Sequence, residues 1–427
     1  MTSTLAPVLL TAASYYGTLA AARCLGRRGI PVTMAEGRLL APARWSRFVS
    51  RRVSCPDVGD AGEFLRWAKR FGEASPGHVL YPTTDDLAWL LAKHRDELGR
   101  SFKLYSPGVD AVYALLNKKR LHAAATEAGL ETPRTWFPRS REELAGIAGE
   151  ARFPLLVKPQ TQVLFESHSK GARAEGPGDL AARWSDFAAA NRCGPKMLEF
   201  DPEAGTPILQ ELHAEAAQGI YSLSGFVDET GELFVCRAST KVLQRPRKLG
   251  IGLCFEAAPV DGELAEKVRR MCARLGYFGV FEAEFIGVGD RKLLIDFNPR
   301  LYSQMAFDVD RGMPLPLLAY LGATGDRETL KAEVLHARLR QARTQPERVY
   351  THHFILEVLL RGQGVSGKLS ADEVSTWRRW LAEHDQWTTD AVADPDDGLP
   401  AMVDVAQHLF GYARHPRAFV RSMILDA

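Results

Sequence analysis

The sequence has no long apolar run and no excess of one charge. No stretch of about 18 consecutive apolar residues occurs in its 427 residues, which excludes a membrane-spanning helix. The 54 lysines and arginines and the 52 aspartates and glutamates leave a formal net charge of +2. This balance argues against a nucleic-acid coat or a polybasic membrane binder, so we expect neither partner. With 25% charged and 46% hydrophobic residues, the composition excludes wholesale disorder.

Cysteine motifs and a targeting segment are also lacking. The six scattered cysteines form no C-x-x-C pair and have no histidine partners at zinc spacing, which predicts buried, reduced thiols. The first residues, MTSTLAPVLLTAASYYG, carry no basic region, and their apolar stretch favours a first strand over a signal peptide. Both observations predict a cytoplasmic protein.

Glycine is scarce at the turn where a dinucleotide would need it. Residues 12–17, AASYYG, hold one glycine where a pyrophosphate turn needs three, which disfavours a nicotinamide site with Glu36 on its second strand. The surrounding pattern is α/β. The predicted strands are residues 8–11, 30–34, 78–81 and 102–105, and the predicted helices are residues 19–25 and 87–98. This alternation predicts an open parallel, Rossmann-like sheet whose strand ends contact ligands.

After a helix predicted over residues 117–129, the strand candidates come in pairs. The predicted hairpins are residues 220–227 with 232–238 and residues 280–286 with 292–297. This part of the chain is therefore predicted to be α+β with antiparallel strands. The final residues, 326–427, carry basic helical patches and predict a mainly helical C-terminal extension.

The segment VFEAEFIGVGDRKLLIDFNPR, residues 280–300, is the strongest chemical motif. Side chains on a strand alternate between two faces, so Glu282 and Glu284 share a face, as do Asp296 and Asn298. A hairpin brings these pairs opposite one another, and gathered carboxylates repel unless a cation lies among them. We therefore predict a Mg²⁺ site, with Mn²⁺ as the alternative ion. Its predicted ligands are Glu284, Asp296 and Asn298, with Glu282 as a further candidate; ordinary solvent-facing acids are the alternative.

Several cations lie in positions that suit a phosphate. Lys158 ends an apolar strand, where the alternative is a lysine that reaches out to solvent at a sheet edge. Residues 241–248, KVLQRPRK, read as a short basic loop that leads into two glycines, and a solvated loop is the alternative. Lys118 lies in the first turn of its helix, where the dipole disfavours a cation unless an anion is shared with it.

In this order the segments resemble the ATP-grasp superfamily, of the carboxylate–amine or carboxylate–thiol ligase type, over about residues 5–320. The motifs that carry the resemblance are YPTTDD (81–86) with Asn117-Lys118, LVKP (156–159), LQELH (209–213), the basic residues from Lys241, and Glu284, Asp296, Asn298 and Arg300. The resemblance implies an N-terminal α/β domain (1–115), a two-lobe ATP-grasp domain (116–325) and the C-terminal extension. Within the ATP-grasp domain, it implies a lid-bearing lobe over about residues 135–205 and a metal-bearing lobe over about residues 206–325.

The resemblance also implies a function and a set of site residues. ATP and Mg²⁺ would convert a carboxylate to an acyl phosphate that an amine attacks, with release of ADP and phosphate. A small-molecule kinase and a non-catalytic nucleotide-binding module are the alternatives. The implied partners are a carboxylate, an amine of amino-acid or peptide type, and a second copy of the chain. The implied nucleotide-binding residues are Lys118, Lys158, Lys170, Gln210, Glu211, Leu212, His213, Glu215, Lys241 and Arg247; the implied catalytic residues are Arg300, Lys241 and Arg245.

The segment that corresponds to the lid, residues 160–175, departs from the family pattern. It holds a single glycine, Gly171, so we expect any cover over the phosphates to use side chains such as Lys170 and His168. A loop this polar buries little apolar area, so we expect it to become ordered only with nucleotide.

Overall fold

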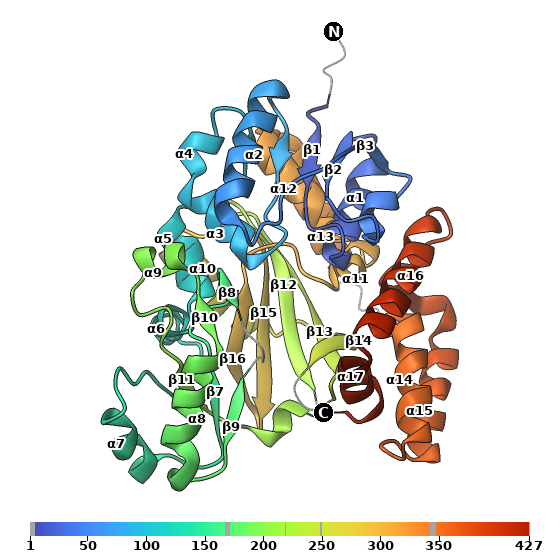
Figure 1. The fold of residues 1–427 in the computed structure, drawn as a ribbon. Helices are drawn as coiled ribbons and strands as arrows, with labels where there is room; N and C mark the ends of the chain where they lie inside the picture. Colours follow the sequence, from blue (N-terminus) through green and yellow to red (C-terminus); the bar gives the residue numbers. More distant parts are fainter. Residues whose placement is uncertain (1–4, 167–170, 218, 248–249, 342–346, 427) are drawn as a thin grey trace.

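A computed structural model describes residues 5–166, 171–217, 219–247, 250–341 and 347–426 (Figure 1). The N-terminal sheet has the strand order β3-β2-β1-β4-β5, and all its strands are parallel. Its strands are β1 (Val8–Leu10), β2 (Val32–Ala35), β3 (Val49–Val53), β4 (Val79–Leu80) and β5 (Lys103–Leu104), and its first helices are α1 (Tyr16–Gly26), α2 (Ala61–Ala74) and α3 (Asp85–Lys93). The predicted open parallel sheet is confirmed. Strand β3 was not predicted, because its exposed Arg51 and Arg52 hide the strand pattern at this sheet edge.

A small antiparallel sheet follows, in the order β6-β11-β7-β9. Its strands are β6 (Thr135–Trp136), β7 (Leu155–Lys158), β9 (Ala172–Ala174) and β11 (Ile208–Glu211), and its helices are α7 (Glu143–Glu150) and α8 (Pro177–Ala190). Leu155, Val157 and Leu209 point to the same side and pack with Phe187 of α8 in a separate small core. This sheet carries Lys158 and Gln210 at diagonal positions on the adjacent strands β7 and β11.

The largest sheet has seven strands in the order β16-β15-β12-β13-β14-β17-β18. They are β12 (Ile220–Val227), β13 (Phe234–Arg245), β14 (Ile251–Ala258), β15 (Gly279–Val288), β16 (Arg291–Asn298), β17 (Val349–Thr351) and β18 (Thr388–Asp390). Both predicted hairpins are present, as β12–β13 and β15–β16. The prediction of a basic loop from Lys241 is wrong, since residues 241–245 form the end of β13.

Helices join the large sheet to the rest of the molecule. Helices α5 (Val109–Leu116), α6 (Lys118–Ala128) and α10 (Gly262–Leu275) pack on one face of it in a common core. Helices α11 (Met305–Asp310), α12 (Leu315–Thr324) and α13 (Arg327–Gln341) lie between it and the N-terminal sheet (Figure 1). One core therefore contains Val8 of β1, Leu318 of α12 and Phe226 of β12, which fixes the two sheets to each other.

The C-terminal residues form mainly helices, as predicted, at one side of the large sheet (Figure 1). These are α14 (His353–Val365), α15 (Ala371–Glu383), α16 (Leu399–Arg414) and α17 (Pro416–Phe419). The short strands β17 and β18 also come from this region and extend the large sheet beyond β14. In the part of the chain that the structure describes, no helix has the length and apolar character needed to cross a membrane.

An acidic turn ties the C-terminal region to the N-terminal domain. The carboxylate of Asp397 is buried and accepts hydrogen bonds from Arg23 Nε at 2.9 Å, Ser46 Oγ at 2.7 Å and the Arg47 backbone N–H at 2.8 Å. Arg23 also donates to the carbonyl oxygen of Val392 at 2.8 Å. These contacts hold the turn before α16 against α1 and the segment that follows it.

We expect Asp397→Ala to lower the free energy of unfolding by about 3 kcal/mol, because the buried Arg23 guanidinium loses its hydrogen-bonded carboxylate and keeps only the more distant Asp394, at 3.8 Å. Asp396→Ala is the matched control: its side chain is 71% exposed, and we expect a change within about 0.5 kcal/mol. Chemical denaturation of both variants measures the difference. Equal, small effects would show that the Asp397 network does not fix the C-terminal region.

Candidate nucleotide and metal site

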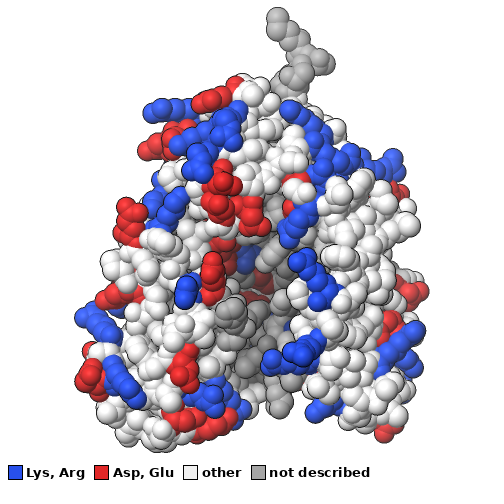
Figure 2. Space-filling view, in the orientation of Figure 1, with Lys and Arg blue, Asp and Glu red and all other residues white. Residues whose placement is uncertain are grey.

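A cavity of about 470 Å³ lies between the N-terminal domain and the large sheet. Figure 2 shows a hollow in the middle of this face of the molecule, with acidic and basic side chains around it. The cavity walls come from α1, α6 and β13 to β16, with the segment that follows β16. Eight residues predicted from the sequence meet in this cavity: Lys118, Lys241, Arg245, Glu282, Glu284, Asp296, Asn298 and Arg300.

The β15–β16 hairpin places its acidic side chains as the alternation predicts. Glu282 lies opposite Asn298 and Glu284 lies opposite Asp296, so the four side chains share one sheet face. Ser222 on β12 is the next neighbour of Glu284 in the register. Its buried hydroxyl has no hydrogen-bond partner among the described residues. This hydroxyl at the base of the cavity can therefore still form a hydrogen bond.

Lys241 neutralises one of these carboxylates. It lies on β13, and its ammonium donates to Glu284 Oε1 at 2.7 Å. Burial alone would lower the pKa of Lys241, but the charge and hydrogen bond of Glu284 hold it above its usual value. The lysine is therefore a fixed cation at the base of the cavity.

Lys118 neutralises a second carboxylate from the other side. The side chain of Asn117 accepts from the backbone N–H groups of Lys119 and Arg120 and caps α6, which sets Lys118 at the helix start. Its ammonium donates to Asp296 Oδ1 at 2.5 Å. Burial would raise the pKa of Asp296, but the charge of Lys118 holds it below its usual value. A lysine in the first turn of a helix is expected to have an anionic partner, and for Lys118 this partner is Asp296.

Glu282 is the most deeply buried of the three acids. Its carboxylate accepts from Asn298 Nδ2 at 3.0 Å and also from Gln304. Burial, and then the charge of Glu284, raise the pKa of Glu282 to about 7. Glu282 is therefore held by amide donors, whereas Glu284 and Asp296 are held by ammonium groups.

Arg300 links the sheet to the N-terminal domain. Its guanidinium donates to Asp85 Oδ1 at 2.5 Å, to Asn298 Oδ1 at 2.9 Å and to its neighbour's carbonyl oxygen at 2.9 Å. Burial would lower the pKa of Arg300, but Asp85 and Tyr15 hold it above its usual value. This arginine brings a permanent positive charge to the cavity wall and ties α3 to the end of β16.

The donor set suits Mg²⁺, which prefers carboxylate and amide oxygens. Glu284 and Asp296 offer oxygens from directly opposed positions, and each is at present paired with a lysine that a divalent cation would replace. Asn298 is the weaker candidate, because Arg300 already occupies its amide oxygen. Glu284 and Asp296 are therefore the residues that would hold a metal ion, with Asn298 beside them.

The predicted nucleotide-binding residues of the smaller sheet lie on and just after two paired strands, with Lys158 diagonally across from Gln210. Lys158 Nζ donates to Gln210 Oε1 at 3.1 Å, and Gln210 Nε2 donates to Thr135 Oγ1 at 3.1 Å. Lys158 also lowers the pKa of Asp296, which places its charge near the metal site. The remaining members of the group follow at the end of β11 and in the short helix after it: Glu211, Leu212, half-buried His213, and exposed Glu215.

Arg247 is not among the residues that line the cavity, and neither are the residues predicted on the smaller sheet and just after it, which are Lys158, Gln210, Glu211, Leu212, His213 and Glu215. The guanidinium of Arg247 binds Asp426 at 2.9 Å and the carbonyl oxygen of Lys368 at 2.8 Å, so it stabilises the C-terminal region instead. Lys170 lies outside the described residues, as does His168.

The start of the predicted lid is packed, contrary to the premise of a wholly polar loop. Val163 is fully buried in a core with residues of the N-terminal domain, and the backbone N–H of Leu164 donates to Asp86 Oδ1 at 2.6 Å. The amide oxygen of Gln160 accepts from Asn117 at 3.1 Å. Residues 160–166 of this segment therefore have partners within the protein itself.

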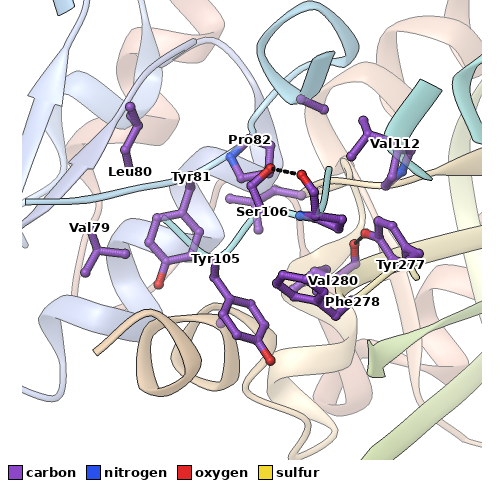
Figure 3. A pocket seen from close by; sticks show the side chains of 16 residues that line it. Val79, Leu80, Tyr81, Pro82, Tyr105, Ser106, Val112, Tyr277, Phe278 and Val280 are labelled. Atoms are coloured by element: carbon purple, nitrogen blue, oxygen red, sulfur yellow. Dashed lines mark hydrogen bonds between the residues drawn. The ribbon is translucent and has the colours of Figure 1, made fainter. Parts of the chain in front are cut away.

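Tyr15, Asp85 and Gln304 also line the cavity. Tyr15 and Asp85 follow β1 and β4, at strand ends where ligand contacts were expected, whereas Gln304 was not predicted. Asp85 stood within the YPTTDD motif, but its role as the partner of Arg300 depends on a contact across 215 residues. Gln304 follows the N-P-R ending closely, and this proximity was the available signal. A separate cavity of about 20 Å³ between the N-terminal sheet and β15 is lined mainly by apolar and aromatic groups such as Tyr81 and Phe278 (Figure 3), so it is a packing gap.

Comparison with known proteins agrees with this geometry. No family model matches the chain. The chain is 26% identical over 250 residues to a carbamoyl phosphate synthase large chain of Thermus thermophilus, a match that covers 56% of this chain and 22% of that protein. It is 27% identical over 204 residues to the formate-dependent phosphoribosylglycinamide formyltransferase of Chlorobium phaeobacteroides, covering 45% and 47%. The chain thus spans less than half the length of either relative.

Solved structures share the fold. The biotin carboxylase domain of Hydrogenobacter thermophilus 2-oxoglutarate carboxylase superposes with a TM-score of 0.60 at 15% identity, over 75% of this chain and 70% of that one. The parallel N-terminal sheet, the small antiparallel sheet and the large, mostly antiparallel sheet together form an ATP-grasp fold. The chain is similar over about half of its length to the two relatives named above.

We expect Glu284→Gln to lower the free energy of unfolding by about 3 kcal/mol, because it removes the charged partner of the buried Lys241 ammonium. Replacing both members, as Lys241→Met with Glu284→Gln, removes the unpaired charge and should recover most of that loss. Denaturant titration of the single and double variants forms the test. A double variant that is less stable than the single one would contradict the pairing.

Proposed function

We propose that the protein is a ligase that uses ATP and Mg²⁺ to activate a small carboxylate as an acyl phosphate and to join it to an amine. The observation that supports the proposal most directly is the set of paired charges in the large cavity. Glu284 and Asp296 are the residues that would hold Mg²⁺, and Lys118, Lys241 and Arg300 surround them. This arrangement suits a polyphosphate bound through its metal ion and through fixed cations.

The first chemical step moves a phosphoryl group. A carboxylate oxygen of the substrate attacks the terminal phosphorus of ATP, and the bond from that phosphorus to the ADP oxygen breaks. Bound Mg²⁺ would neutralise phosphate oxygens, and Lys158 and Lys241 stabilise the negative charge as it shifts. Arg300, held by Asp85 and Asn298, is placed to bind the carboxylate or its acyl phosphate.

The second step forms the product. The amine attacks the carbonyl carbon of the acyl phosphate, a C–N bond forms, and inorganic phosphate leaves with the electron pair of the broken C–O bond. The protein must hold the reacting groups in line and keep water from the acyl phosphate. The cavity lies between the N-terminal domain and the large sheet, and the segment around Val163 packs beside it. This placement supports a site that keeps water from the acyl phosphate.

The relatives support the class of substrate. One is by name a formate-dependent transferase, and the biotin carboxylase domain was solved with MgADP and bicarbonate as a dimer. We therefore propose that this chain also uses a small carboxylate and an amine as substrates and that it forms a homodimer. We also propose that the protein is cytoplasmic, because its six cysteines are free and most of them are buried.

An assay of ADP and phosphate release tests the proposal. The protein is incubated with ATP, Mg²⁺ and panels of carboxylic acids and amines, each alone and combined. We expect sustained release of both ADP and phosphate only when an acid and an amine are present together. ADP release with a stable phosphorylated product and no free phosphate would indicate a kinase, and no release with any pair would leave only a nucleotide-binding module.

We expect Asp296→Asn to abolish this turnover and to weaken Mn²⁺ binding in the presence of ADP at least about tenfold, because the ion loses a charged ligand. Electron paramagnetic resonance of free Mn²⁺ measures the affinity without any need for turnover. Glu131→Gln is the matched control, since Glu131 forms a half-exposed pair with Arg291 outside the cavity. Unchanged Mn²⁺ affinity in Asp296→Asn would refute the metal assignment.

A further inference from the structure

A second, smaller cavity adjoins the large one on the side of the C-terminal helices. Its volume is about 70 Å³, and Tyr16, Arg245 and Gln304 line both cavities. Strand β14 and helix α14 form its walls, since Leu253 and Ile355 belong to one hydrophobic cluster, and α16 lies on the same side of the molecule (Figure 1). A molecule in the small cavity would therefore lie directly beside the metal and phosphate site.

The walls of the small cavity suit a compact apolar group next to an anion. Leu253, Phe255, Tyr350 and Ile355 contribute apolar and aromatic surface. Arg245 is the one lysine or arginine among its lining residues, and it lies at the border with the large cavity. This is the pattern of a site that holds an apolar side chain and one carboxylate.

A buried hydrogen-bonded network reaches this cavity from α16. His352 Nε2 lies 2.9 Å from Asp404 Oδ2, and His408 Nε2 lies 3.5 Å from the same oxygen. The hydroxyl of Tyr16 lies 3.2 Å from His408 Nε2 and 3.4 Å from Asp404 Oδ1. Asp404 is completely buried, whereas Tyr16 and His408 face the cavity.

These groups are close enough together to hold a metal ion, with donor atoms within 4.8 Å of one another. The hydrogen bonding of His352 argues against that use. Its Nδ1 accepts from the backbone N–H of Ile355 at 3.4 Å as the cap of α14, so its Nε2 carries the proton that points to Asp404. To bind a metal through Nε2, His352 would have to release that proton and lose its hydrogen bond to Asp404. The hydrogen bonds therefore favour a network that holds or passes a proton over a metal site.

The protonation state of His408 fits this role. Burial lowers the pKa of His408 to about 4, so the imidazole is neutral at neutral pH and has one nitrogen able to accept a proton. Protonation would create an imidazolium beside the buried Asp404 carboxylate, which stabilises it as an ion pair. The titratable and charged groups that face His408 are Tyr16, Arg245, His352, Asp404 and Tyr412.

We propose that the small cavity binds the nucleophilic amine, an amino acid or similar amine with a compact apolar side chain, and that His408 accepts the proton this amine must lose. This inference rests on the proposed ligase function. Arg245 binds the carboxylate of the amine substrate, and the walls from β14 and α14 enclose its side chain. As the amine nitrogen forms its bond to the acyl carbon and phosphate leaves, the ammonium proton passes to the unprotonated ring nitrogen of His408.

Hydroxylamine separates this role from carboxylate activation. It is small, largely unprotonated at neutral pH, and traps acyl phosphates as hydroxamates, so it needs neither the small cavity nor a base. We expect His408→Phe, which keeps a ring in place, to lower the amide-forming rate with amino acids about 100-fold and to retain hydroxamate formation. We also expect its amide-forming rate to rise with pH relative to the wild type, because free amine then replaces the base.

Leu253→Phe narrows the small cavity without touching the network, and we expect it to raise the KM for the amino acid and not for hydroxylamine. His336→Phe, an exposed histidine on α13, is the matched control. Equal losses of amide and hydroxamate in His408→Phe would overturn the assignment, as would stoichiometric Zn²⁺ in the wild type that is lost in this variant. If the wild type forms no hydroxamate with any acid, the proposed ligase function itself fails, which is visible before any variant is made.

Discussion

Three carboxylates gathered on one face of a buried sheet are the constraint on which this structure depends. An isolated buried carboxylate is strongly destabilising unless it is paired and hydrogen-bonded. Glu282, Glu284 and Asp296 obtain their partners from three distant segments: Gln304 after β16, Lys241 on β13, and Lys118 at the start of α6. The site can therefore exist only when these segments have come together, so folding of the sheet and closure of the cavity are one requirement.

How much of this was predictable follows from the range of each interaction. The alternation of side chains on a strand and one hairpin turn were enough to place Glu282, Glu284, Asp296 and Asn298 on one face. Arg247 looked equivalent to Lys241 in the sequence, but its partner is Asp426, 179 residues away. The basic run from Lys241 resembled a loop because a lysine in a buried strand needs a charged partner. That partner, Glu284, lies 43 residues away and cannot be identified from the local sequence.

The C-terminal region shows the same limit. Its helices were predictable from composition, but its hydrogen-bonded network was not. Asp404 and His408 join this network only through their contacts with Tyr16 of the first helix, which lies 388 and 392 residues earlier in the chain, respectively. The acidic turn at Asp397 provides the physical link, since its bonds to Arg23 and the segment after α1 hold the chain that leads into α16. The extension is thus built into the wall of the site rather than appended to the fold.

The ion pairs of the cavity are also compatible with the metal and nucleotide of the proposed function. Lys118 and Lys241 supply two positive charges to Asp296 and Glu284. A divalent cation between those carboxylates would supply the same total positive charge. The two carboxylates would then no longer require the ammonium groups of Lys118 and Lys241 to neutralise them. Each lysine lies within hydrogen-bond distance of a metal-ligand candidate and therefore needs only a small displacement to meet a phosphate oxygen. The interaction that lets the carboxylates stay buried is therefore the same one that would place the lysines close to a nucleotide in the proposed function.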